Sequence, residues 1–200
     1  MRDLFEPRSL GAYLSGAETN FSMQLLLSPH NDDETLFASF TILREAPAVI
    51  VVYDSFIQTA RGYPGCDWKT RRHETEAALS ILGVSKIGFL GLRDDRATDT
   101  AALKAALSVA GEFETVYAPA VEQGGHEQHN TVGRIAAEVF PNVVSYMTYT
   151  NRGKSTGIPV PFDPEWTLLK LKALACYESQ IRLKDNVEHF MRDQREYYAA

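Results

Sequence analysis

The feature that most constrains this chain is the segment 25–34, LLLSPHNDDE, in which an apolar run meets one histidine and three consecutive acids. A buried strand cannot continue through these acids, because carboxylates are rarely buried without partners. We therefore expect a core strand that ends at Ser28 or Pro29, with the polar residues at its carboxyl end. In open α/β sheets this edge is where ligands bind. The next residues, TLFASFTILRE, have helical spacing, which also places the acids at a helix N-terminus, where negative charge is favourable.

A second polar cluster, GGHEQH, occupies residues 124–129. It follows a short apolar run at 115–119 and precedes a helical pattern at 131–140, so it too is expected at the carboxyl end of a strand. An isolated HxxH carries little information, because exposed histidines are common. Two histidine-bearing turns at the same edge of one parallel sheet favour a shared site.

Together the two clusters offer His30, Asp33 and His129, two imidazoles and one carboxylate, as ligands for one divalent metal. His30 and Asp33 are three residues apart across the turn and can face a common point. Asp32 is expected to point elsewhere and, with His126, to be free for acid–base chemistry. The competing interpretation is that the acids only cap the helix. The preceding histidine and the second cluster make that interpretation less favourable.

The remaining chain alternates apolar runs with helical patterns. Further strands are expected at 48–54, 87–90 and 143–149. Further helices are expected at 69–82, 101–110, 166–177 and 187–198. This alternation predicts the α/β class, with a single Rossmann-like three-layer domain and a mainly parallel central sheet. We assign residues 23–200 to this domain and residues 1–22 to an N-terminal extension.

Two loops are expected to border the site. Arg93, Asp94 and Asp95 follow a strand at the ligand edge, and we expect Asp95 to contact substrate; the alternative is a solvated turn. Asn31 is a second expected substrate contact, because its side chain is expected to project beside the ligands. Residues 151–164 contain two glycines and three prolines with little periodicity, which favours a lid or substrate loop.

Composition narrows the class of partner. The 200 residues suit one domain, and the net charge of −6 argues mildly against a nucleic-acid-binding surface. The two cysteines do not resemble a disulfide framework. The N-terminus shows no secretory signal. No apolar run approaches the roughly 20 residues that a membrane span needs. We expect a cytoplasmic protein with a small-molecule partner and neither a nucleic-acid nor a membrane partner; a homo-oligomer stays open.

The PHxDDE segment with a distant GHxxH resembles the LmbE-like, or PIG-L-like, N-deacetylases. These are zinc enzymes that remove an acyl group from N-acetylglucosamine-type sugars and related amides. The helix RRHETEAALSILGV, which contains Arg71 and Glu74, and the late segment KALACYESQ resemble further family elements. The resemblance covers residues 23–190.

The resemblance implies one Zn²⁺ per chain, held by the three ligands named above, and an N-acylated sugar derivative as substrate. Asp32 would be the general base that takes a proton from the attacking water. His126, as an imidazolium, would stabilise the oxyanion or protonate the leaving amine. Arg71 would pair with the catalytic acids or the substrate; the alternative for it is a surface ion pair with Glu74 or Glu76.

Three positions depart from the usual family pattern. Asn31 replaces a proline, Glu127-Gln128 replaces Pro-Asp between the two histidines, and Tyr177 stands where many members have a histidine. None of these changes removes a metal ligand, so they put the substrate in doubt rather than the chemistry.

Other functions stay open at this point. Two histidines and one carboxylate also describe a mononuclear iron oxygenase site, but the usual jelly-roll fold of those enzymes conflicts with the βα alternation. A catalytically inactive metal- or sugar-binding member would not need Asp32 and His126. A deacylase of a non-sugar amide is the remaining alternative.

Overall fold

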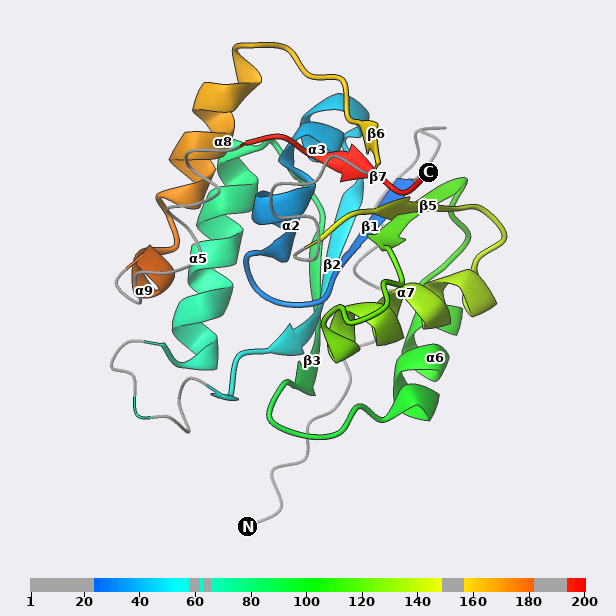
Figure 1. Ribbon diagram of the computed structural model, residues 1–200. Helices are drawn as coiled ribbons and strands as arrows, with labels where there is room; N and C mark the ends of the chain where they lie inside the picture. Colours follow the sequence, from blue (N-terminus) through cyan, green and yellow to red (C-terminus); the bar gives the residue numbers. More distant parts are fainter. Residues whose placement is uncertain (1–23, 58–61, 63–65, 149–156, 182–193) are drawn as a thin grey trace.

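The computed structural model describes residues 24–57, 62, 66–148, 157–181 and 194–200 (Figure 1). The expected N-terminal extension lies outside the described residues, and so does the first part of the expected loop at 151–164. No described helix is long and apolar enough to cross a membrane. Cys66 and Cys176 are thiols that form no disulfide with each other.

A seven-stranded sheet in the order β3-β2-β1-β4-β5-β7-β6 forms the centre of the described structure. Strands β1 to β5 pair in parallel, and β7 pairs antiparallel with both β5 and β6. The strands are β1 Gln24–Ser28, β2 Ala48–Asp54, β3 Ile87–Arg93, β4 Thr115–Pro119, β5 Val143–Tyr146, β6 Ile158–Pro159 and β7 Tyr197–Tyr198. The mainly parallel sheet is confirmed, and an antiparallel edge is added to it.

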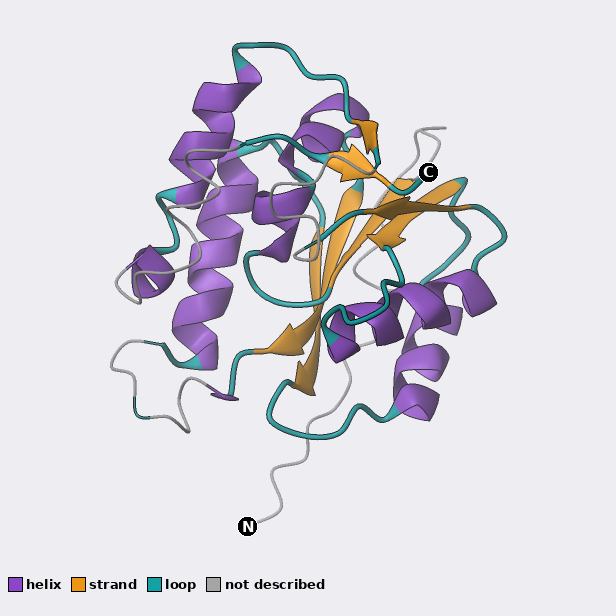
Figure 2. Ribbon diagram, in the orientation of Figure 1, coloured by secondary structure: helices purple, strands orange, loops and turns teal. Residues whose placement is uncertain are grey.

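Helices cover both faces of the sheet, which makes three layers (Figure 2). They are α2 Asp33–Phe37, α3 Ser39–Glu45, α5 Trp68–Ile81, α6 Thr100–Ser108, α7 Glu127–Val139, α8 Trp166–Leu174 and α9 Glu178–Ile181. Alternate residues of β1 supply the two cores: Leu25 and Leu27 pack with residues of α6 and α7, whereas Leu26 packs with residues of α2, α5 and α8. All three leucines are fully buried, as expected for a parallel strand covered on both faces.

The strand order creates a topological switch point between β1 and β4. From β1 the chain builds outward through β2 to β3, and it then returns to place β4 on the other side of β1. Ligands bind at the carboxyl ends of the strands beside such a point. The two polar clusters follow β1 and β4, so the fold brings them to this edge.

Several expected elements differ from the observed ones. The helix expected at 131–140 begins at Glu127, because the His126 side chain accepts a hydrogen bond from the Gln128 backbone N–H and caps the first turn. The first expected helix is two short helices, since Ala38, with φ of −139° and ψ of 17°, leaves the helical conformation between them. The prediction of a helix at 187–198 is wrong for its described end, where Tyr197–Tyr198 form β7.

Gly133 lies where α7 packs closely on the end of β4. A methyl group there would meet the backbone oxygen of Pro119 at 2.2 Å. Alanine favours helix by about 1 kcal/mol, but relieving the overlap requires α7 to move, so we expect Gly133→Ala to be net destabilising by about 1–3 kcal/mol. Denaturant unfolding measures this effect. The control is Gly88→Ala, whose methyl would meet Ile50 Cγ1 at an ordinary 3.5 Å; similar losses in both variants would contradict the packing argument.

Candidate metal centre

The end of β1 and the start of α7 bring three predicted ligands together. The distance from Asp33 Oδ2 to His30 Nδ1 is 3.0 Å, and the distance to His129 Nε2 is also 3.0 Å. The two histidine nitrogens are 3.2 Å apart. Ligand atoms about 2.0–2.1 Å from a tetrahedral zinc lie about 3.3 Å from one another. The three side chains therefore fit one divalent ion with only a small increase in the distances between their ligand atoms.

The carboxylate of Asp33 gives independent support for a cation site. Asp33 is fully buried, and its Oδ1 atom has no hydrogen-bond partner among the described residues. Burial alone would raise the pKa of this carboxyl, but the adjacent His129 and His30 hold the pKa well below its usual range. Burial lowers the pKa of His30, but the hydrogen bond and charge of Asp33 outweigh it and raise that pKa to about 9. A buried anion between two imidazoles favours a cation.

His126 lies beside these ligands and is exposed. Its ring centroid is 5.0 Å from that of His30 and 4.8 Å from that of His129, and the three histidines alone could also hold a metal. However, Nδ1 accepts a hydrogen bond of 3.3 Å from the Gln128 backbone N–H. This bond places the proton of a neutral ring on Nε2, which then donates rather than ligates.

The charge of His126 differs from the sequence expectation. Burial and the two neighbouring histidines lower its pKa to about 4, so the ring is neutral near pH 7 rather than an imidazolium. A neutral Nε2–H can still donate a hydrogen bond to an oxyanion.

Asp32 lies next to the ligands and is held by Arg71. Arg71 is buried, and its Nη2 donates to Asp32 Oδ2 at 2.9 Å and to the backbone oxygen of Asn31. Its Nη1 donates to Glu74 at 2.8 Å, and Glu74 in turn accepts from the backbone N–H and hydroxyl of Ser179, both at 2.7 Å. Arg71 therefore pairs with Asp32, and it is not the surface arginine that the sequence left as an alternative.

The environment of Asp32 suits a proton acceptor. Burial raises the pKa of its carboxyl to about 7, against the opposing effect of Arg71. Its φ of 121° lies in a region that non-glycine residues avoid. Such backbone strain costs about 1–3 kcal/mol and persists only where the surrounding contacts hold the residue in place. Strained residues of this kind are concentrated at functional sites.

Two expected substrate contacts do not gain support. The Asn31 side chain is fully buried, where it donates to Thr75 Oγ1 at 3.3 Å and accepts from Ser55 Oγ at 3.5 Å. These contacts favour a role for Asn31 in supporting the turn, and its role toward a substrate stays a prediction. Asp95 is exposed and forms a bidentate pair with Arg93 at 2.8 and 2.6 Å. Among the described residues, no contact joins Asp95 to the cluster of His30, Asp33 and His129.

Gln128 and Asp94 also belong to the site, although the sequence alone indicates no role for either. Gln128 Oε1 lies 2.7 Å from His30 Nε2, and Gln128 Nε2 donates to the backbone oxygen of Asp94 at 3.2 Å. Asp94 also accepts hydrogen bonds from the backbone N–H groups of Phe56 and Ile57, at 2.6 and 2.9 Å. The position of Gln128 between the two histidines was the available signal.

Tyr177 has a buried supporting role. Its hydroxyl donates to the Glu34 carboxylate, and Arg71 lies over its ring at 5.3 Å. The ring is fully buried, so Tyr177 is not placed to act on a substrate in the way that an exposed histidine could.

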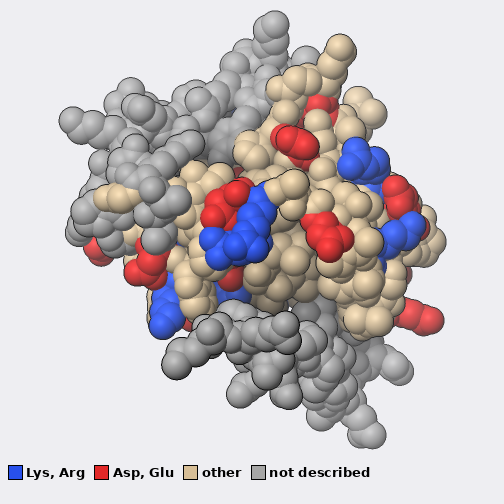
Figure 3. Space-filling view, turned by 90° about the horizontal axis from the view of Figure 1, so that it is seen from below, with Lys and Arg blue, Asp and Glu red and all other residues tan. Residues whose placement is uncertain are grey.

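The surface near the carboxyl ends of β2 and β3 has mixed charge. Figure 3, the view from below Figure 1, shows described basic and acidic side chains interspersed over this face. A protein that binds nucleic acid usually has an extended stripe of basic side chains. The described part of this face has no such stripe.

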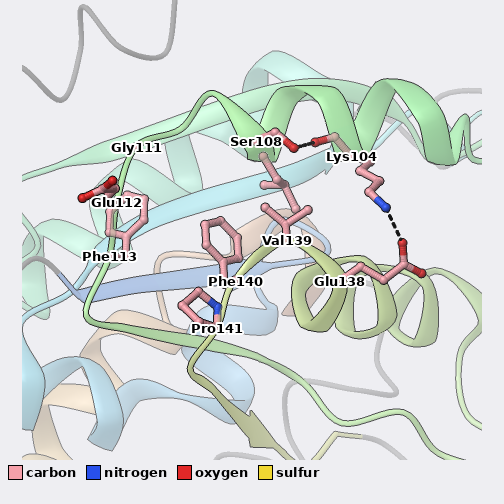
Figure 4. A pocket seen from close by; sticks show the side chains of 10 residues that line it. Lys104, Ser108, Gly111, Glu112, Phe113, Glu138, Val139, Phe140 and Pro141 are labelled. Carbon is pink, nitrogen blue, oxygen red and sulfur yellow. Dashed lines mark hydrogen bonds and ion pairs between the residues drawn. The ribbon is translucent and has the colours of Figure 1, made fainter.

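A hollow of about 530 Å³ between α6 and α7 is separate from the cluster of His30, Asp33 and His129 (Figure 4). It is lined by residues that include Lys104, Phe113, Glu138 and Phe140. The lining residues 111–113 and 140–141 lie just before the first residues of β4 and β5. The hollow therefore lies at the amino edge of the sheet, opposite the histidines, and is not the substrate site of this cluster.

The comparisons agree with this architecture. The family model described as PIG-L, GlcNAc-PI de-N-acetylase, matches residues 25–140, which include both polar clusters. A search of curated proteins found no match. The conserved protein TT1542 from Thermus thermophilus is similar in structure, with a TM-score of 0.66 and 19% identity over 90% of this chain and 94% of that chain.

Two further solved structures share the fold. N,N'-diacetylchitobiose deacetylase from Pyrococcus horikoshii has a TM-score of 0.66 and 19% identity over 97% of this chain and 86% of its own. GalB, the 4-carboxy-2-hydroxymuconate hydratase from Pseudomonas putida, has a TM-score of 0.56 and 18% identity over 86% of this chain and 84% of its own. Identities this low show the fold alone.

Proposed function

Because the chain belongs to the PIG-L, GlcNAc-PI de-N-acetylase, family, we propose that it is a zinc-dependent hydrolase that removes an N-acetyl group from an amino-sugar-like small molecule. The observation that carries this proposal is the convergence of His30 Nδ1, Asp33 Oδ2 and His129 Nε2 within 3.2 Å, with Asp32 beside them. Three protein ligands are typical of catalytic zinc sites, whereas structural sites have four.

One Zn²⁺ held by these ligands would supply Lewis acidity toward a water molecule and an amide carbonyl. Asp32 accepts the proton of the attacking water, and Arg71 keeps its carboxylate in place. His126 Nε2–H donates to the oxygen that gains negative charge or to the departing nitrogen. We assign the catalytic roles to Asp32 and His126 and a positioning role to Arg71.

The substrate class rests on two supports of different kinds. The family description names GlcNAc-PI, and the Pyrococcus horikoshii neighbour is a deacetylase of N,N'-diacetylchitobiose. Both point to N-acetylated amino sugars. Deacylation of a non-sugar amide is the alternative that the same ligands and base would serve.

A substrate screen tests the proposal. The protein, loaded with zinc, is incubated separately with N-acetylglucosamine, N,N'-diacetylchitobiose, N-acetylated nucleosides and N-acetylated polyamines, and acetate release and product mass are measured. We expect acetate from at least one amino sugar. Acetate from the polyamines or nucleosides alone would refute the sugar assignment but retain the deacetylase. The same protein is also incubated with 4-carboxy-2-hydroxymuconate, the compound named for the GalB neighbour. Hydration of that compound, with no acetate from any N-acetylated compound, would replace the deacetylase with a hydratase.

A further inference from the structure

Gln128 joins three segments at the metal cluster. It lies on the first turn of α7, between His126 and His129, and its side chain reaches His30 after β1 and the backbone of Asp94 after β3. Only 9% of the residue is exposed. Its two polar atoms are therefore engaged in protein contacts from which water is largely excluded.

These contacts fix which way the Gln128 amide faces. A backbone carbonyl can only accept a hydrogen bond, so the amide nitrogen must face the Asp94 oxygen, 3.2 Å away. The amide oxygen then faces His30 Nε2 at 2.7 Å. An amide oxygen can only accept, so His30 Nε2 must carry a proton. In the neutral ring, this leaves the lone pair on Nδ1, the atom 3.0 Å from Asp33 and 3.2 Å from His129.

We infer that Gln128 is a positioning residue that holds His30 as the Nε2–H tautomer and so makes Nδ1 the metal-ligating nitrogen. This inference rests on the metal dependence proposed above and adds a residue to it. A hydrogen bond to the second nitrogen of a ligating histidine fixes both the tautomer and the ring orientation. Glutamine performs this role without adding a charge, whereas a carboxylate at the same position would make the cluster more negative.

The test compares two substitutions with one matched control. Gln128→Leu removes both the acceptor for His30 and the donor to Asp94. Gln128→Glu keeps an acceptor for His30 but, as a carboxylate, loses the donor to Asp94. Gln123→Leu makes the same chemical change as the first variant on the exposed turn before α7.

Zinc affinity, measured by chelator competition without substrate, is the first readout. We expect Gln128→Leu to weaken zinc binding by about 10–100-fold, the usual effect of losing such an outer partner. Gln128→Glu should stay within a few-fold of the wild type, and Gln123→Leu should match it. Equal losses in Gln128→Leu and Gln128→Glu would overturn the inference, because they would assign the effect to the Asp94 contact. Wild-type affinity in Gln128→Leu would overturn it as well.

The His30 tautomer is the second readout, from ¹⁵N NMR of the zinc-loaded protein labelled at histidine. We expect a proton on Nε2 and the signature of a metal-bound nitrogen at Nδ1. A protonated Nδ1, or a wild-type protein that binds no zinc, contradicts the inference. Neither readout uses a substrate. Failure of the substrate screen with both results as expected would therefore count only against the proposed reaction.

Discussion

Asp32→Asn is expected to lower the deacetylation rate by about 10²–10⁴-fold, the usual effect of losing a general base, while the protein keeps its zinc. The asparagine retains the shape of the side chain and an oxygen that can accept from Arg71 at the present distance of 2.9 Å. It lacks the basic oxygen. The loss should therefore appear in kcat at saturating substrate, and the zinc content should stay at the wild-type value.

The control for this substitution is Glu114→Gln, which also converts a carboxylate to an amide, at an exposed residue directly before β4 and away from the site. We expect wild-type rates from the control. Wild-type turnover in Asp32→Asn would show that another group is the base, and His126 would then be the first candidate.

Asp33→Asn is expected to weaken zinc binding by more than about 100-fold, because it removes a ligand and not merely an outer hydrogen-bond partner. The carboxylate lies 3.0 Å from His30 Nδ1 and from His129 Nε2, and it is the only anionic member of the proposed ligand set. His129→Ala should likewise lower zinc occupancy. Activity of the Asp33 variant should recover in part when zinc is added in excess, which Asp32→Asn should not show.

Metal content measured on both aspartate variants separates the two roles. Adjacent aspartates are chemically alike, but the structure aims one at the histidines and the other at Arg71. If Asp32→Asn lost its zinc while Asp33→Asn stayed fully loaded, the two roles would be reversed.

Local sequence was sufficient to predict that His30, Asp33 and His129 lie close together. Leu25–Leu27 are buried on both faces of the sheet, so the chain must leave the core where the acids begin. The same argument applied to β4 placed His126 and His129 at the same edge. Both strands flank the topological switch point, which is why two short motifs about a hundred residues apart could be assigned to one site.

Residues that act through long-range contacts could not be predicted in this way. Gln128 has its role because Asp94, at the end of β3, presents a backbone oxygen to it. Asp94 and Asp95 both follow that strand, and nothing local to the sequence indicates which of them turns inward. Burial of Asn31 depends on Thr75 in α5 and Ser55 after β2, contacts that only the folded chain defines.

The antiparallel edge of the sheet was missed for a related reason. Residues 187–198 have a composition compatible with helix, but Tyr198 pairs with β5 and β6, and its hydroxyl contacts Thr41 and Arg44. The nearby Glu196 forms a buried ion pair of 2.6 Å with Lys170 of α8 and accepts from the Phe40 backbone N–H at 3.0 Å. Tertiary contacts of this kind override local propensity.

The fold alone does not decide the reaction. A deacetylase and a hydratase are both similar in structure to this chain, at 19% and 18% identity. Function must therefore be argued from the site. Here the argument is the position of Asp32 beside the three proposed metal ligands.

Titration of the metal-free protein with zinc, followed by acetate release from the amino sugar found in the screen, tests the central claim most directly. We predict negligible acetate release without metal and a linear rise that stops at one zinc per chain. Full activity in the metal-free protein would contradict the account, and so would one tightly bound zinc per chain with no hydrolysis of any N-acetylated compound.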